Sequence, residues 1–173
     1  MASLVGNACA RCGLVLYSGG ARGVDSLATQ AALEARGSAV GILADSLEKA
    51  IRAPDARAAL ALLTPYAPNA GFSVGAAMGR NRPIYVLADY ALVVSSDAEK
   101  GGTWAGATEA LKARWVPVFV LEGPDVPDGN RLLLRKGALP FPEQFIESSS
   151  MLHDWLEARA ADVEPPLTQA QLL

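Results

Sequence analysis

Two hydrophobic patterns alternate along the chain: short runs of consecutive apolar residues, and longer segments whose apolar residues recur every three or four positions. The first pattern is typical of strands buried in a parallel sheet, and the second of amphipathic helices. The runs predict strands at 14–17, 39–43, 91–95 and 117–121. The spaced segments predict helices at 2–12, 24–36, 103–114, 130–136 and 142–160, one that starts at Asp55 and carries Ala58, Ala59 and Leu62, and one that starts at Ser73 and kinks or restarts near Pro83. The polar stretch 45–52 fits a loop or a short helix, and 64–71 a loop. Strands that alternate with helices predict an α/β fold, a parallel sheet with helices on both faces.

The segment Ser18-Gly-Gly-Ala-Arg-Gly-Val-Asp25 joins the first predicted strand to the second predicted helix. Its glycines let the backbone bend sharply and approach a ligand without a Cβ in the way. The helix would begin near Val24, so its unpaired N–H groups and the positive end of its dipole would point back toward the turn, an arrangement that seats phosphate. The spacing matches neither the dinucleotide fingerprint nor the P-loop. Asp25 is expected to cap or brace the helix start.

Ligands of open parallel sheets bind beyond the carboxyl ends of the strands, and three glycine-bearing loops are predicted there: 18–23, 95–103 and 121–130. Arg80-Asn81-Arg82 adds two guanidinium groups that suit phosphate. In Lys100–Trp104, Thr103 is the expected N-cap, and Trp104 either stacks on a base or packs in the core. The Arg80 stretch also fits an ordinary solvated helix start, with each arginine paired to a nearby carboxylate such as Asp89. The candidate DNA- or phosphate-binding residues are Ser18, Gly19, Gly20, Arg22, Arg80, Asn81, Arg82, Lys100, Gly101, Gly102, Thr103 and Asn130.

Composition limits the protein class without defining a function. With 173 residues, 51% hydrophobic and 19% charged, the chain is expected to form one domain over 1–160, followed by a mobile tail at 161–173. The net charge of -3 excludes a protein coated in basic residues but not a local basic groove. No apolar run approaches the roughly 20 residues that span a membrane, and the N-terminus does not resemble a signal peptide, so we expect a cytoplasmic protein.

The sequence contains few groups that carry chemistry. Cys9 and Cys12 lie on predicted helix 2–12, and with one distant histidine, His153, they do not make a zinc site. A reversible redox pair is conceivable, but two small buried residues are the simpler interpretation. Neither a Ser-His-Asp triad nor a spaced pair of carboxylates is evident. We therefore expect no cofactor, no metal and no enzymatic activity.

The glycine turn, Arg80-Asn-Arg82, Gly102-Thr103 and Gly129-Asn130 with Lys136-Gly-Ala138 together resemble the DNA-processing protein A family (DprA, also called Smf) over about residues 1–140. The resemblance implies a Rossmann-like domain that binds single-stranded DNA, acts as a homodimer and loads the RecA recombinase in natural transformation (competence) of bacteria. It implies that Arg80 and Arg82 contact the DNA backbone, while the serine, glycines, threonine and Asn130 line a phosphate pocket. Relative to the family's pattern, we expect this sequence to lack the first strand and the C-terminal winged helix.

Two alternatives share the same loops. Gly101-Gly102-Thr103 with Glu109 loosely resembles the motif of the LOG family, which hydrolyses nucleoside monophosphates, although the spacing differs. A module that senses a nucleotide without turnover would also use the phosphate seat, but it would not need Arg80 and Arg82 to extend into a groove.

Overall fold

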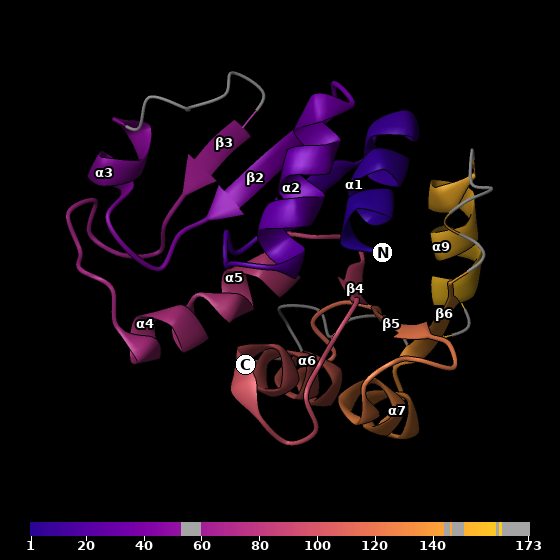
Figure 1. The fold of residues 1–173 in the computed structure, drawn as a ribbon. Coiled ribbons are helices and arrows are strands. Elements are labelled where there is room, and N and C mark those ends of the chain that lie inside the picture. Colours follow the sequence, from indigo (N-terminus) through magenta and orange to yellow (C-terminus); the bar gives the residue numbers. More distant parts are fainter. Residues whose placement is uncertain (53–59, 144–145, 147–150, 162, 164–173) are drawn as a thin grey trace. The chain divides into compact units, whose positions relative to one another are not determined.

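The computed structural model describes residues 1–52, 60–143, 146, 151–161 and 163. The chain divides into two compact units, Met1–Ile84 and Tyr85–Leu173, and each is described by itself. Each unit contains a three-stranded parallel sheet with helices around it (Figure 1). This arrangement confirms the predicted α/β class. Among the described helices, none has the length and apolar character needed to cross a bilayer.

The first unit is built on the sheet β1-β2-β3. Its elements are α1 (Ala2–Arg11), β1 (Val15–Ser18), α2 (Val24–Glu34), β2 (Ser38–Ile42), α3 (Leu47–Ile51), β3 (Leu60–Leu63), α4 (Val74–Gly79) and the start of α5 (Asn81–Val86). β1 is an outer strand of this sheet, and Val15 on it is 49% exposed, so the prediction that this apolar run is buried in the sheet is wrong at Val15. The stretch 45–52 forms the short helix α3, which Ser46 caps.

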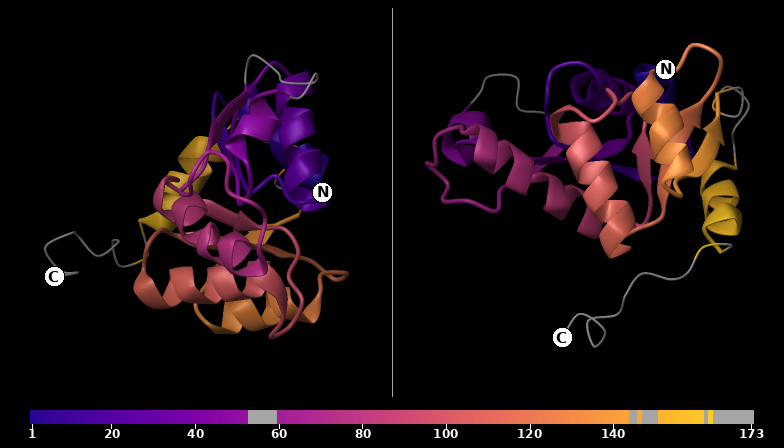
Figure 2. Two further views of the ribbon diagram at one scale, coloured as in Figure 1. Left: turned by 90° about the vertical axis from the view of Figure 1, so that its left-hand side faces the viewer. Right: turned by 90° about the horizontal axis from the view of Figure 1, so that it is seen from below.

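Helices α1 and α2 lie side by side (Figures 1 and 2). The buried face of α1 consists of small residues and one valine: Ala2, Val5, Gly6, Ala8 and Cys9. Leu4 on the same helix is 37% exposed, and Cys12, which was expected to be buried, is only half-buried. A Cβ on Gly6 would come within 2.9 Å of the backbone nitrogen of Ala32, so the two helices approach closely only because this position has no side chain.

The third strand is a correction to the sequence analysis. A helix was expected from Asp55 through Leu62, but Leu60–Leu63 is a strand that pairs in parallel with β2, from Ala39↔Leu60 to Ile42↔Leu63. Ala58 and Ala59 lie outside the described residues. Leucine and alanine are good helix formers, and here pairing with β2 overrides their local preference.

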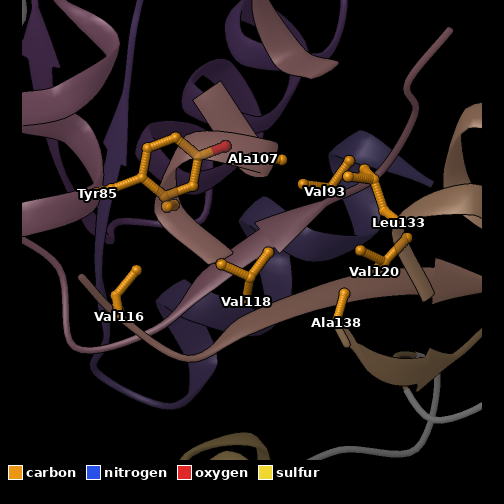
Figure 3. Packing of buried hydrophobic residues seen from close by; sticks show 9 residues of the cluster. Tyr85, Val93, Ala107, Val116, Val118, Val120, Leu133 and Ala138 are labelled. Atoms are coloured by element: carbon orange, nitrogen blue, oxygen red, sulfur yellow. The ribbon is translucent and has the colours of Figure 1, made fainter. Parts of the chain in front are cut away.

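The second unit is built on the sheet β4-β5-β6. Its elements are the remainder of α5, β4 (Ala91–Val93), α6 (Gly101–Ala113), β5 (Val118–Glu122), α7 (Asp128–Arg135), β6 (Leu139–Pro142) and α9 (Leu152–Ala160). Helices α6 and α7 lie side by side (Figure 2). A buried cluster from the helices and strands of this unit forms its core (Figure 3), and comprises Tyr85, Val93, Ala107, Ala110, Val116, Val118, Val120, Leu133 and Ala138.

The C-terminal part of the second unit also differs from the prediction. A single helix over 142–160 is wrong, because Pro142 ends the strand β6 and the helix α9 begins only at Leu152. Phe145 lies outside the described residues. The indole of Trp155 on α9 packs against Phe119 and Phe141, with ring centroids 5.7 Å and 5.2 Å apart, so these aromatic contacts hold the helix on the sheet.

Candidate functional site

The glycine turn of the first unit follows β1 and leads into α2. Gly20 and Gly23 have φ angles of 65° and 93°, a backbone region that L side chains rarely adopt. The carboxylate of Asp25 accepts hydrogen bonds from the N–H groups of Gly19 (3.1 Å) and Ala21 (3.3 Å). The predicted brace is therefore confirmed. It also means that a carboxylate from the chain itself satisfies two of the turn's backbone donors.

Arg80 lies at the junction of α4 and α5, and its side chain points inward. The residue is 7% exposed, and its guanidinium Nη1 donates to the carbonyl oxygens of Gly19 and Ile42, the latter at 2.8 Å. These carbonyls stand at the carboxyl ends of β1 and β2. Burial lowers the pKa of the guanidinium, and the nearby charges of Asp25, Tyr66 and Asp45 oppose that shift. Arg80 thus ties the glycine turn to β2.

The close packing of Arg80 explains one of the turn glycines. A Cβ on Gly19 would lie 2.7 Å from Nη2 of Arg80 and closer still to its Cζ and Nη1 atoms. The Nε atom of Arg80 is buried and has no hydrogen-bond partner among the described residues. An unpaired buried donor is costly, so the burial of Arg80 is opposed by the loss of this hydrogen bond.

The other predicted residues of this unit lie nearer the surface. Arg22 in the turn and Arg82 on α5 are exposed, and Asn81 is half-buried. The hydroxyls of Ser18 and Thr29 share a hydrogen bond of 2.9 Å, so Ser18 fastens the end of β1 to α2. The first unit therefore brings Ser18, Gly19 and Arg80 together and leaves Arg22 and Arg82 on its surface.

Sequence reasoning missed the residues that hold the segment before Arg80. The hydroxyl of Thr64 donates to the carbonyl of Leu43 (3.1 Å), and the hydroxyl of Tyr66 donates to the carbonyl of Ala76 on α4 (2.7 Å). Both residues follow β3 in a stretch that was predicted only as a loop. Their position directly after a strand was the available signal, but that signal was lost because the strand was read as a helix.

In the second unit, Asn130 lies inside the protein. It is 0% exposed; its amide oxygen accepts from the backbone N–H of Ser96 (2.8 Å), and its amide nitrogen donates to the carbonyls of Val94 (3.1 Å) and Leu121 (3.0 Å). Helix α7 begins at Asp128, two residues before the predicted start, which sets Asn130 in its first turn facing the strand ends. Its predicted phosphate contact stays a prediction, and one that would require these internal bonds to break.

The glycine-bearing turn at the start of α6 is the exposed part of the second unit's site. Lys100 is the N-cap and makes no side-chain capping bond, so the expectation that Thr103 caps this helix is wrong. Gly101, Gly102 and Thr103 are exposed in the first turn. Trp104 packs against the core cluster, and the Lys136 Nζ lies 5.6 Å from its ring centroid, within reach of a cation–π contact.

The described residues offer little to support catalysis. They hold no group of three or more His, Cys, Asp or Glu side chains that could bind a metal ion. Cys9 is buried and Cys12 half-buried, and both are free thiols. Burial, with a smaller contribution from the charge of Cys12, raises the pKa of the Cys9 thiol to about 11, which disfavours the thiolate that redox chemistry needs. Glu109 is exposed on α6, beyond its first turn.

Comparison with known proteins gives a family match and several similar folds. Residues 1–149 match the model of the family described as DNA recombination-mediator protein A. One similar structure is that of DNA processing protein A from Helicobacter pylori, which was solved to study how that protein binds single-stranded DNA. It is 24% identical to this chain with a TM-score of 0.68, and the match covers 94% of this chain and 74% of that one. The protein of the same name from Streptococcus pneumoniae is 22% identical with a TM-score of 0.65, covering 81% of this chain; the chain spans about half (53%) of its length.

A different functional class shares the architecture. The molybdenum cofactor carrier protein of Chlamydomonas reinhardtii is 22% identical with a TM-score of 0.59, covering 91% of this chain and 86% of that one. At these identities the likeness concerns the fold, and it confirms the predicted Rossmann-like class. No curated protein sequence matches the chain significantly.

Proposed function

Because the chain belongs to the DNA recombination-mediator protein A family, we propose that it binds single-stranded DNA through the sugar-phosphate backbone and serves in DNA recombination or uptake. A relative of similar fold, the Helicobacter pylori protein, is described as binding single-stranded DNA, which supports this choice of ligand. The binding role is proposed without catalysis and without a cofactor.

The observation that carries the proposal is the contrast between the two arginines of Arg80-Asn-Arg82. Arg80 is buried and holds the ends of β1 and β2, whereas Arg82, two residues later, is exposed. An arginine fixed in the fold can orient the start of α5, so that its exposed neighbour is presented to a phosphate at low entropic cost. We therefore assign the phosphate contact to Arg82 and a positioning role to Arg80.

The exposed polar groups of the second unit extend the same proposal. Lys100 with Gly101, Gly102 and Thr103 offers a cation, backbone donors and a hydroxyl at the positive end of α6, a helix of 13 residues. Contacts of this kind read the backbone and not the bases, so little sequence preference is expected. Homodimer formation, loading of RecA and a cytoplasmic location are further parts of the proposal, and they rest on the family alone.

The direct test is fluorescence anisotropy of a labelled single-stranded oligonucleotide at two or more salt concentrations. Parent protein is compared with Arg82→Ala and with Arg11→Ala, a control that removes another exposed arginine, at the end of α1. Loss of one phosphate contact should weaken binding and reduce the slope of log K against log salt by about 0.7. Binding that is absent at low salt in the folded parent, or equally reduced by both variants, would contradict the proposal.

No observation favours the two alternatives. A LOG-type hydrolase would need Glu109 at the reacting bond, but this residue is exposed on α6 and not in its first turn. A nucleotide-sensing module would need free donors in the glycine turn, where Asp25 already accepts from two of the N–H groups.

A further inference from the structure

The glycine turn of the first unit already holds an anion, and that anion belongs to the chain. One oxygen of Asp25, Oδ2, accepts from the N–H of Gly19 at 3.1 Å and from the N–H of Ala21 at 3.3 Å. Asp25 is the second residue of α2, where the helix dipole favours negative charge. A phosphate oxygen entering the turn would seek the same two N–H groups and the same positive helix end.

The backbone of Gly19 is also held at its second peptide group, the one that joins it to Gly20. Its carbonyl accepts from the guanidinium of Arg80, which in turn reaches the carbonyl of Ile42 on β2. Gly19 is thus held on both sides of its Cα atom, so a shift of this residue that carries its N–H away from Asp25 would also disturb the bond of its carbonyl to the buried arginine. A phosphate must either displace the carboxylate or bind beside it, against its negative charge.

We propose that Asp25 is a specificity-determining residue, whose carboxylate excludes inorganic phosphate and mononucleotides from the glycine turn. The second half of the inference rests on the proposed function: a DNA strand, unlike a single phosphate, gains contacts from several exposed cations at once. Discrimination of this kind works by a built-in repulsive element, which a polyanion outweighs and a small anion does not.

In the test, inorganic phosphate is added to the protein, and its binding is measured from the shifts of the backbone amide signals of Gly19 and Ala21 in two-dimensional nitrogen–proton NMR spectra. Parent protein is compared with Asp25→Ala, which empties the turn, and Asp25→Asn, which keeps an oxygen acceptor but no charge. Asp45→Ala is the matched control, because Asp45 is exposed, follows β2 and also acts electrostatically on Arg80, while the two turn amides donate to Asp25.

Asp25→Ala should bind phosphate at these amides at least about tenfold more tightly than parent and the Asp45→Ala control, with Asp25→Asn in between. Equal affinity in parent and Asp25→Ala would overturn the inference, and so would an equal gain in Asp45→Ala, because bulk charge would then explain the result. The amide spectrum itself reports whether each variant is folded. If Asp25→Ala does not fold, Asp25→Asn decides, and an affinity within about twofold of parent overturns the inference.

The outcome is separable from that of the proposed function. Oligonucleotide binding by the parent protein tests the DNA proposal without reference to Asp25. A chain that fails to bind DNA but gains phosphate binding on loss of Asp25 would refute the function and keep the exclusion role. A chain that binds DNA, but whose turn binds phosphate as readily with Asp25 as without it, would support the proposed function and refute the exclusion role.

Discussion

Replacing Asn130 by leucine should strongly destabilise the protein, because the side chain of Asn130 links three backbone groups in the second unit. Leucine has a similar size, so the main change is the loss of the bonds to Ser96, Val94 and Leu121. The bonds to Ser96 and Leu121 are fully buried, and leaving a buried polar group unpaired costs about 1–3 kcal/mol. Adding a smaller amount for the part-buried bond to Val94, we expect a loss of roughly 4 kcal/mol, a large part of the total stability of a typical domain.

The assay is urea unfolding followed by far-ultraviolet circular dichroism, with Arg131→Leu as the matched control. Arg131 is the next residue of α7 and is exposed; its ion pair with Asp128 is also exposed, so its loss should cost less than about 1 kcal/mol. Asn130→Asp should be at least as harmful as the leucine variant, because a carboxylate cannot donate to the two carbonyls. A leucine variant within about 1 kcal/mol of parent would refute this reasoning, and would mean that Asn130 is available for a ligand.

Two further predictions concern α1. Gly6→Ala should destabilise the protein by about 1–3 kcal/mol in urea unfolding, because the new Cβ would meet the backbone of Ala28 and Ala32, which cannot move aside as a flexible side chain would. Gly75→Ala on α4, where a Cβ would have no neighbour within 4 Å, is the control and should be neutral or slightly stabilising; equal losses in the two would contradict the packing argument. Burial raises the pKa of the Cys9 thiol from its ordinary 9.0 to about 11, so the folded state holds the thiol proton more tightly than the unfolded state. The resulting stability is fully present below about pH 9 and is lost as the pH rises toward 11, by roughly 2 kcal/mol. Unfolding measured across this range should be less pH-dependent in Cys9→Ala than in parent, and an unchanged slope would count against the burial argument.

The sequence analysis was right for the elements whose local hydrophobic pattern agrees with their burial in the folded protein. The strands at 39–43 and 117–121 were placed within a residue or two, because consecutive apolar residues there are buried in the sheet. β3 was missed because its leucines and alanine favour a helix locally and only pairing with β2 makes them a strand. β6 was missed because it contains Pro140 and Pro142, and proline is tolerated in an outer strand such as this one.

Among the site residues, those with partners nearby in the sequence were predicted, and those with distant partners were not. The role of Asp25 was predictable, because its partners lie four and six residues away in the same turn. The burial of Arg80 was not, since its carbonyl partners are 38 and 61 residues distant and only the folded sheet brings them together. Asn130 was misplaced by a shift of two residues in the start of α7, which turned an expected surface amide into an internal one.

The buried position of Arg80 has a consequence for local unfolding in the first unit. Helices α4 and α5 have six residues each, too few to persist in water without support from the rest of the fold. Arg80 stands at their junction, and its guanidinium ends on the carbonyls of Gly19 and Ile42. Release of that one side chain would therefore loosen the carbonyl end of the glycine turn together with the junction of the two helices. The turn, the ends of β1 and β2 and the helix junction should therefore open together, and the amide protons of these segments should exchange with solvent at similar rates.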